Sequence, residues 1–275
     1  MSELLWAANP LAVARHYRRY RYLLWQLTRR EVEARYRGSF LGLLWSLLTP
    51  LIMLAVYTFV FTVVLQVRWG TAVGENRADF ALALFAGLTA FGLFSETIGT
   101  APELILANRN YVTRVVFPLE ILPVARFLAN LVQAAFSTAI LVLALLVLRG
   151  GVPWTFALLP VALLPLALLS LGGAFFLSSL GVFIRDIQQV IGLVTTALLF
   201  LSAVFYPLSS LDPSLRPIFM LNPLVPMIED VRRVTLDGLP PDWALWGPMT
   251  LLSAVLATAG LAWFMKSKHA FADVL

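Results

Sequence analysis

Long stretches without charge dominate this chain and limit what it can fold into. Residues 42–66 (GLLWSLLTPLIMLAVYTFVFTVVLQ) contain no charged side chain, and several later stretches are nearly as apolar. A helix needs about 20 consecutive apolar residues to cross the hydrocarbon core of a bilayer. The mean hydropathy of +0.85 fits the same class of protein. The sequence therefore predicts an all-α integral membrane protein.

The apolar stretches predict six membrane-spanning helices. They lie at residues 42–66, 80–101, 120–148, 154–184, 187–206 and 243–265. The fourth contains Pro160 and Pro165, which predict a tilted or kinked helix. The spans form one transmembrane domain, residues 42–265, between an N-terminal segment, residues 1–41, and a short tail, residues 266–275.

The distribution of Lys and Arg predicts the orientation of the chain. With the N-terminus in the cytoplasm, thirteen of the 20 basic residues fall in cytoplasmic segments and six in external ones. Cytoplasmic loops carry the excess of Lys and Arg in membrane proteins. Both termini are therefore expected in the cytoplasm. The same rule explains the net charge of +5 without nucleic-acid binding.

The densest charge in the chain stands directly before the first span. The stretch LTRREVEARYRGSFLG (27–42) places six charged residues between Arg29 and Arg37. An imperfectly amphipathic helix in the cytoplasmic interface fits this pattern, with arginines reaching lipid phosphates. A simple positive-inside anchor is the alternative. Because Glu31 and Glu33 would be repelled by anionic headgroups, we expect a second contact of this segment with a protein.

Seven prolines interrupt the region between the fifth and sixth expected spans, residues 207–241. Between them, IFMLNPLVPMI (218–228) is too short to span a bilayer and is broken by Pro223 and Pro226. Two short helices that re-enter the outer leaflet fit this pattern, and irregular backbone at that depth indicates a pathway through the membrane. A periplasmic cap without a transport role is the alternative.

Residues that carry chemistry are scarce. Cysteine is absent, and the two histidines, His16 and His269, have no neighbouring set of metal ligands. No lysine directly follows a glycine, so the chain cannot form a P-loop. We therefore expect no metal or cofactor in this chain. If it does energy-driven work, another polypeptide binds the nucleotide.

One acid lies well inside an expected span. Glu96 is about 8 Å from the cytoplasmic end of the second span, and Arg126 is about 10 Å into the third, at 1.5 Å per residue. Intramembrane charges usually pair or line a pathway. We therefore predict a Glu96–Arg126 ion pair. The alternatives are that Glu96 faces a water-filled path, or is protonated and bonded near Ser95 or Thr89.

Four motifs, in order along nearly the whole chain, resemble one family. They are ARYRGSFLGLLWSLLTPL (34–51), NRNYVTRVVFPLEILPV (108–124), RDIQQVIGLVTTALLFLSAVFYPLSSL (185–211) and LNPLVPMIEDVRRVTLDG (221–238). Together they are similar to the membrane subunits of type-2 ABC transporters that export polysaccharides, the Wzm-like permeases. This family exports O-antigen, capsule or teichoic acid across the bacterial inner membrane.

The resemblance implies both an architecture and partners. Permeases of this family are homodimers with six spans, an N-terminal interfacial helix and periplasmic re-entrant helices, and they dock two ATPase subunits that carry ATP and Mg. The chain itself would then be a transport subunit and not an enzyme. Its contacts with the ATPase would fall on the interfacial helix and the loop between spans two and three, at Glu31, Ala107, Asn108, Arg109, Asn110, Tyr111 and Arg114.

The implied cargo is a polysaccharide on a polyprenyl diphosphate, most simply O-antigen. A sugar polymer offers hydroxyls and apolar faces, so its channel should mix aromatic and small polar side chains. Candidates in spans one and five are Trp45, Tyr57, Phe59, Thr196, Phe200, Phe205 and Tyr206. Arginines at the inner membrane surface could hold the diphosphate, and the candidates are Arg29, Arg30, Arg35 and Arg37.

Two other functions remain open from the sequence. A type-2 ABC exporter of small molecules would share the architecture. A membrane enzyme acting on lipid-linked sugars would need carboxylates or histidines that converge at one membrane face, and the inner face offers only scattered acids.

Overall fold

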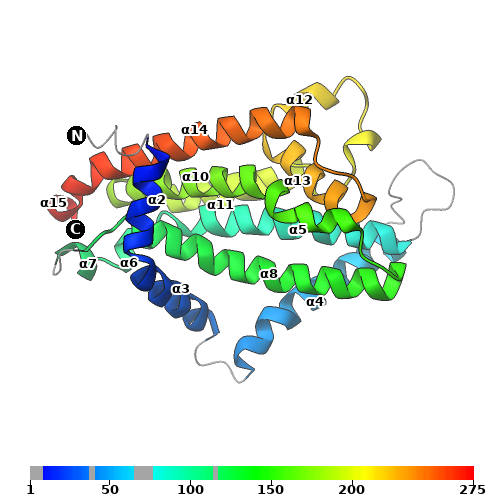
Figure 1. Ribbon diagram of the computed structural model, residues 1–275, viewed down its shortest axis with the longest axis horizontal. Coiled ribbons are helices and arrows are strands. Elements are labelled where there is room, and N and C mark those ends of the chain that lie inside the picture. Colours follow the sequence, from blue (N-terminus) through cyan, green and yellow to red (C-terminus); the bar gives the residue numbers. More distant parts are fainter. Residues whose placement is uncertain (1–8, 37–40, 65–76, 114–116) are drawn as a thin grey trace.

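The computed structural model describes residues 9–36, 41–64, 77–113 and 117–275, and within these ranges it contains helices and no strand (Figure 1). Six longer helices form the bundle: α4 (Trp45–Thr58), α5 (Arg77–Thr100), α8 (Ile121–Arg149), α10 (Leu164–Phe183), α11 (Ile187–Leu201) and α14 (Trp243–Ser267). Each of them lies inside or largely overlaps one of the stretches predicted to span the membrane.

Four helical segments are long and apolar enough to cross a membrane. They are Asp79–Thr100, Ile121–Arg149, Trp154–Phe183 and Trp243–Val274. The helices in the first and fifth expected spans, α4 and α11, are shorter. A π-helical segment, η2 (Phe59–Val64), continues directly from α4. The described chain therefore confirms a multi-pass helical bundle with four segments of span length.

The fourth expected span is a series of helical pieces. It runs through η3 (Trp154–Leu158) and α9 (Leu159–Ala162) before α10 begins. Pro160 and Pro165 each lie in the first turn of a piece. Proline is tolerated there because its missing N–H would have no partner within the helix. The two prolines therefore set where the pieces begin.

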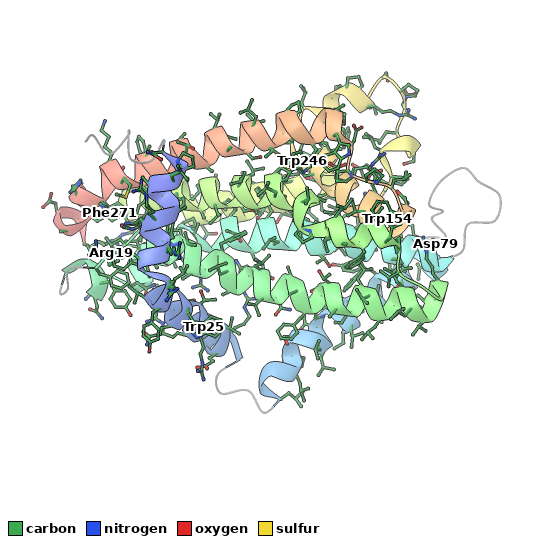
Figure 2. The ribbon with its side chains drawn as sticks, in the orientation of Figure 1. Arg19, Trp25, Asp79, Trp154, Trp246 and Phe271 are labelled. Atoms are coloured by element: carbon green, nitrogen blue, oxygen red, sulfur yellow. The ribbon has the colours of Figure 1, made fainter. Side chains whose placement is uncertain are left out.

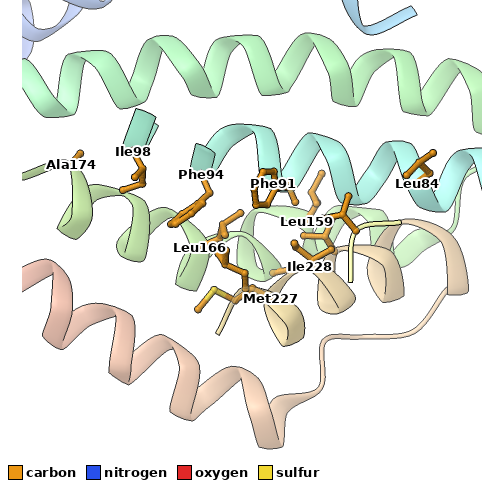
Figure 3. Close-up of a cluster of buried hydrophobic side chains, with 14 of the residues drawn as sticks. Leu84, Phe91, Phe94, Ile98, Leu159, Leu166, Ala174, Met227 and Ile228 are labelled. Carbon is orange, nitrogen blue, oxygen red and sulfur yellow. The ribbon is translucent and has the colours of Figure 1, made fainter. Parts of the chain in front are cut away.

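Helix α5 is the centre of the bundle. It packs against α8, α10, α11 and α13 (Leu224–Arg232). Of its most apolar stretch, 72% is buried inside the protein. Figure 3 shows Phe91, Phe94 and Ile98 of α5 facing Leu166 of α10 and Met227 and Ile228 of α13. The bundle is thus organised around a mostly apolar helix, as expected for a largely buried segment.

Helices α10 and α14 pack backbone to backbone. A Cβ atom added to Gly172 would lie 2.8 Å from the backbone of Ala257, and one added to Gly260 would lie 2.2 Å from the carbonyl oxygen of Gly172. Small residues permit this close approach between membrane helices. The glycines of α10 therefore serve packing within the bundle.

The two ends of the bundle are built from different helices. One end holds both termini, with α2 (Pro10–Arg19), α3 (Arg21–Tyr36), α6 (Leu104–Ala107), α7 (Asn110–Thr113) and α15 (Phe271–Val274) (Figure 1). The other end holds α12 (Arg216–Met220), α13 and a π-helical segment, η5 (Arg233–Asp237). Short connections complete the described chain: η1 (Gly42–Leu44), η4 (Leu208–Ser210) and η6 (Lys268–Ala270). In Figure 2, Arg19 and Phe271 mark the first end, and Asp79 and Trp154 mark the second.

The prolines of residues 207–241 produce the two short helices that the sequence predicts, α12 and α13. Asn222 between them accepts a hydrogen bond from the backbone N–H of Leu224 and donates one to Ser202 Oγ, at 3.0 and 2.9 Å. The side chains of α13 from Leu224 to Ile228 are buried inside the protein. Their re-entry into the bilayer remains a prediction.

Candidate functional site

The N-terminal charge cluster and the loop between α5 and α8 meet in the structure. Arg30 of α3 donates hydrogen bonds to Tyr111 Oη at 2.8 Å and to Asn108 Oδ1 at 3.0 Å. The ring of Tyr111 stacks on Phe117 with 4.4 Å between centroids. Two segments that the sequence analysis assigned separately to an ATPase contact therefore form one surface.

The other predicted contact residues of this loop point outward. Ala107, Arg109 and Asn110 are exposed, whereas Asn108 and Tyr111 are half-buried against Arg30. Arg114 lies outside the described residues. The exposed side chains leave this loop accessible to a partner, and contact with an ATPase remains a prediction for all of them.

Both acids of the charge cluster have partners within the chain. Glu31 Oε2 lies 2.9 Å from Arg126 Nη2, and Glu33 Oε1 lies 2.7 Å from Arg29 Nε. From the sequence alone, these acids predicted a contact with a second protein. The structure corrects that reasoning, because each carboxylate is already neutralised by an arginine of the same chain.

The predicted Glu96–Arg126 ion pair is wrong in its partners. Arg126 pairs with Glu31, and Glu96 Oε2 lies 2.9 Å from Arg35 Nη2. The prediction paired only neighbouring spans and left out α3, which packs along α8 and carries charges of both signs. Helix α3 thus supplies the counter-charge to both residues.

The contacts of α3 with α8 repeat one helical turn apart. Glu31 and Arg35 are four residues apart on α3, and their partners Arg126 and Asn130 are four residues apart on α8. Arg35 Nη2 donates to Asn130 Oδ1 at 2.7 Å, and the buried amide of Asn130 donates to Thr97 Oγ1 of α5 at 3.1 Å. We call the contacts of Glu31 and Arg35 with Glu96, Arg126 and Asn130 the α3 seam. It joins α3, α5 and α8 in a single polar network.

A cavity of about 230 Å³ opens beside the α3 seam, between α4, α5 and α8. Glu96 and Asn130, both bound by Arg35, belong to its wall. The remaining wall mixes aromatic and small polar side chains, among them Thr49, Tyr57, Phe85, Thr89, Gln133 and Ser137. Such a wall offers hydrogen-bond partners and flat apolar faces together, as a saccharide requires.

The structure brings together some of the predicted channel residues. Tyr57 lines the cavity, and its ring lies 6.3 Å from that of Phe205, which lies 5.4 Å from Phe200. Tyr206 donates a hydrogen bond to the carbonyl oxygen of Phe200 at 2.7 Å, and its ring lies 6.0 Å from that of Phe219. Trp45, Phe59 and Thr196 are exposed and are not part of the cavity wall in the described chain. A channel role for all seven remains a prediction.

The four predicted headgroup arginines also separate. Arg29 is exposed, Arg30 faces the loop between α5 and α8, and Arg35 faces the cavity wall. Arg37 lies outside the described residues. Of the three that the structure describes, Arg35 alone contacts the cavity wall, so it is the one of these three best placed to meet a ligand there.

The opposite end contains a buried arginine that the sequence analysis missed. Arg232 of α13 donates hydrogen bonds to the carbonyl oxygens of Ala83, Ala203 and Val204 at 3.1, 2.9 and 2.6 Å, and its side chain is 3% exposed. Ala203 has a positive φ of 52°, where the chain leaves α11. The guanidinium therefore fixes an irregular piece of backbone whose carbonyls would otherwise lack partners. The only sequence signal was an Arg pair in a proline-rich region, which usually indicates exposed residues.

Burial changes the acidity of two groups near the ends of the bundle. It raises the pKa of Asp230 to about 6, although the carboxylate accepts a hydrogen bond from the backbone N–H of Asp242 at 2.7 Å. It also raises the pKa of Tyr17, whose hydroxyl donates to the carbonyl oxygen of Glu120 at 3.3 Å. Within the described ranges no group of three or more His, Cys, Asp or Glu could hold a metal ion.

Comparison with known proteins gives the setting for this geometry. The family model described as ABC-2 type transporter matches residues 22–236. The chain is 30% identical over 265 residues to the O-antigen export system permease protein RfbA of Myxococcus xanthus, covering 96% of this chain and 99% of that protein. A protein of the same name from Klebsiella pneumoniae is 23% identical over 255 residues, covering 92% and 95%. The polysialic acid transport protein KpsM of Escherichia coli is 24% identical over 249 residues, covering 88% and 92%.

Proposed function

The chain belongs to the ABC-2 type transporter family, and we propose that it is the membrane permease of an ABC exporter of polysaccharide. The relatives are named for O-antigen export and for polysialic acid transport, and both cargoes are sugar polymers. The likeness extends over almost the full length of each relative. The proposed role is transport, with ATP and Mg bound by a separate subunit.

The proposal includes the finer architecture expected of such a permease. It has six spans, with α4 and η2 forming the first and α11 most of the fifth. Two copies of the chain assemble with two ATPase subunits in the bacterial inner membrane, with both termini in the cytoplasm. The cargo is a polysaccharide linked to polyprenyl diphosphate. In this arrangement the end of the bundle with both termini faces the ATPase.

The observation that carries the proposal is a continuous polar path from the loop between α5 and α8 to the cavity. Arg30 binds this loop through Tyr111 and Asn108, and five residues further along α3 Arg35 binds Glu96 and Asn130 in the cavity wall. A push on the loop would therefore act on α3, and through it on two helices that border the cavity. Coupling of this kind needs a physical element that both sites contact, and α3 is such an element.

The Arg35–Glu96 pair gives the cavity a chemical role. Arg35 is 30% exposed and Glu96 is 45% exposed, so another anion can reach the guanidinium. A diphosphate offers the same bidentate geometry as a carboxylate with more charge. It would compete with Glu96 for Arg35, and sugar units behind it would meet Tyr57, Gln133 and Ser137.

The outward face of α3 suits the membrane interface or the ATPase. Tyr22, Trp25, Arg29 and Glu33 share one side of the helix at spacings of three and four residues, and all are exposed. Amphipathic aromatics and arginines are typical of the lipid headgroup level. Arg30, also exposed, contacts Tyr111 and Asn108 of the loop between α5 and α8, so α3 has one side for its surroundings and one for coupling.

The test replaces Arg30 with alanine in the complex with the ATPase subunit. We expect the membrane subunit to fold and to bind its partner, while surface polysaccharide falls at least tenfold and ATP hydrolysis no longer responds to cargo. Arg185→Ala is the matched control, because Arg185 is exposed and belongs to neither the loop nor the cavity. Normal surface polysaccharide in Arg30→Ala would remove the α3 path from the mechanism. Normal surface polysaccharide in a strain lacking this chain would overturn the export function itself.

A further inference from the structure

A second, larger hollow lies away from the α3 seam, on the side of the bundle where α2 crosses α10 and α14. Its volume is about 890 Å³, within the range of about 300–1,000 Å³ typical of ligand sites. Pro10, Val13, Ala14 and Tyr17 of α2 form one wall, and α10 and α14 form the other, from Leu168 to Phe175 and from Ala254 to Ala262. We call this hollow the α2 groove.

Among the residues that the structure describes, the wall of the α2 groove has no side-chain polar group left for a polar ligand. Its two hydroxyl groups are both used inside the protein. Tyr17 donates to the carbonyl oxygen of Glu120, and Thr258 donates to that of Ala254 at 2.8 Å. The other lining side chains are apolar. Water would gain few hydrogen bonds there, so an apolar occupant is favoured.

The length and place of the groove match one leaflet of a bilayer. From Ala254 to Ala262 the groove follows α14 for about 12 Å at 1.5 Å per residue, close to half of a hydrocarbon core of about 30 Å. The α2 wall of the groove belongs to the end of the bundle that holds both termini, where α2 runs across α10 and α14 (Figure 1). A lipid acyl chain lying along α14 would have this length and depth.

Helix α2 adds positive charge beside the groove. Arg15, Arg18 and Arg19 are exposed, and α2 contains no acid. Within the described ranges no carboxylate lies within 4.0 Å of these three side chains. Arg18 follows Tyr17 directly and lies one turn after Ala14, so it stands at the edge of the groove. A basic helix beside an apolar slot is complementary to an anionic phospholipid.

We infer that the α2 groove binds one anionic phospholipid, with an acyl chain along α14 and the phosphate at the arginines of α2. This site is separate from the cavity beside α3 and does not depend on the exported cargo. The bound lipid fills the space between α2 and the bundle, so it fixes the position of α2 and of α3, which follows it directly in the chain. The lipid is a resident part of the fold.

The experiment measures retained lipid by native mass spectrometry after the full-length protein is delipidated and given phosphatidylglycerol or phosphatidylcholine. The wild-type chain should retain one phosphatidylglycerol per copy and prefer it to phosphatidylcholine. Ala259→Trp, an exposed position in the groove, should abolish this retention, whereas Ala244→Trp, exposed on the same helix outside the groove, should not. Arg18→Gln should weaken phosphatidylglycerol binding about fivefold, and Arg185→Gln should leave it unchanged.

Three results would overturn the inference. Equal retention of both lipids would remove the role of the arginines. Unchanged retention in Ala259→Trp would place the lipid elsewhere. A change of oligomeric state in Ala259→Trp without a change in bound lipid would assign the groove to a second copy of the chain. None of these readouts involves ATP or cargo, so they are independent of the export assay.

Discussion

Arg35 at one end of the bundle and Arg232 at the other are held in different ways, although a carboxylate pair, Arg149–Asp79, lies at the second end as well. At the end with the termini, Arg30, Arg35 and Arg126 are between 26% and 48% exposed and contact carboxylates or amide and phenol oxygens. At the other end, Arg232 is 3% exposed, and its guanidinium donates to three backbone carbonyls and also contacts Glu229 Oε2 at 3.2 Å. A carboxylate pair in contact with water can exchange its partner for another anion, whereas buried carbonyls cannot leave without opening the backbone. We call Arg30, Arg35 and Arg126 with their partners the adjustable end, and Arg232 with its three backbone carbonyls the fixed end.

The largest effect should follow from Arg232→Met. The change leaves the carbonyls of Ala203 and Val204 buried without this donor, so we expect a loss of roughly 3–5 kcal/mol of stability or a failure to fold. Thermal unfolding in detergent measures it. Arg233→Met is the control, because Arg233 is about one-third exposed and, within the described chain, its guanidinium donates to one carbonyl, that of Pro240, and lies 3.9 Å from Asp230. Equal effects of the two changes would contradict the fixed end.

A methyl group at Gly87 should test the same end from the opposite side. A Cβ there would lie 2.5 Å from Nη2 of Arg232, so the guanidinium would have to move away from its carbonyls. We expect Gly87→Ala to cost about 1–3 kcal/mol, as overpacking does. Gly92→Ala, on the same helix with nothing within 4 Å of the added Cβ, should instead be neutral or gain up to about 1 kcal/mol. Unfolding temperatures of the two variants in the same detergent measure the difference.

The sequence predicted the positions of the helices better than it predicted which side chains contact one another. Uncharged stretches place the helices because a membrane helix must be apolar along its length, and prolines place the break between α12 and α13. The sequence also indicated that the charge cluster and the loop between α5 and α8 are functional segments. It did not predict that Arg30 joins them. Pairing depends on which helices pack, and no local pattern shows that α3 lies along α8.

Two misses have related causes. The Glu96–Arg126 prediction compared the depths of two residues in two neighbouring spans. It did not consider α3, whose Arg35 and Glu31 are the actual partners of Glu96 and Arg126. Helix α2 was not predicted as a functional segment, because residues 27–42 carry a denser cluster of charge. Yet α2 separates its apolar side, Val13 and Tyr17, more cleanly from its arginines.

The Glu31–Arg126 pair should show a coupling of intermediate size. The two side chains are 13% and 26% exposed, so we expect a double-mutant cycle with Glu31→Gln and Arg126→Met to give about 1–2 kcal/mol. The exposed pair Arg29–Glu33 is the control and should show a much smaller coupling, because both side chains are well solvated. Additive effects of Glu31→Gln and Arg126→Met on thermal stability would mean that the two charges do not stabilise the α3 seam together.

The smallest effect on stability should come from Tyr111→Phe. Arg30 loses one acceptor at 2.8 Å but keeps Asn108 and the ring face, whose centroid lies 5.7 Å from the guanidinium carbon. The site is exposed, so water replaces the phenol oxygen and we expect a loss below about 0.5 kcal/mol. Transport should nevertheless fall, because a looser loop passes less of its movement to α3. Surface polysaccharide and unfolding temperature, measured on the same variant, separate the two effects. If both stay at the wild-type level, the hydroxyl contributes nothing to coupling, and the adjustable end works through Asn108 and the ring alone.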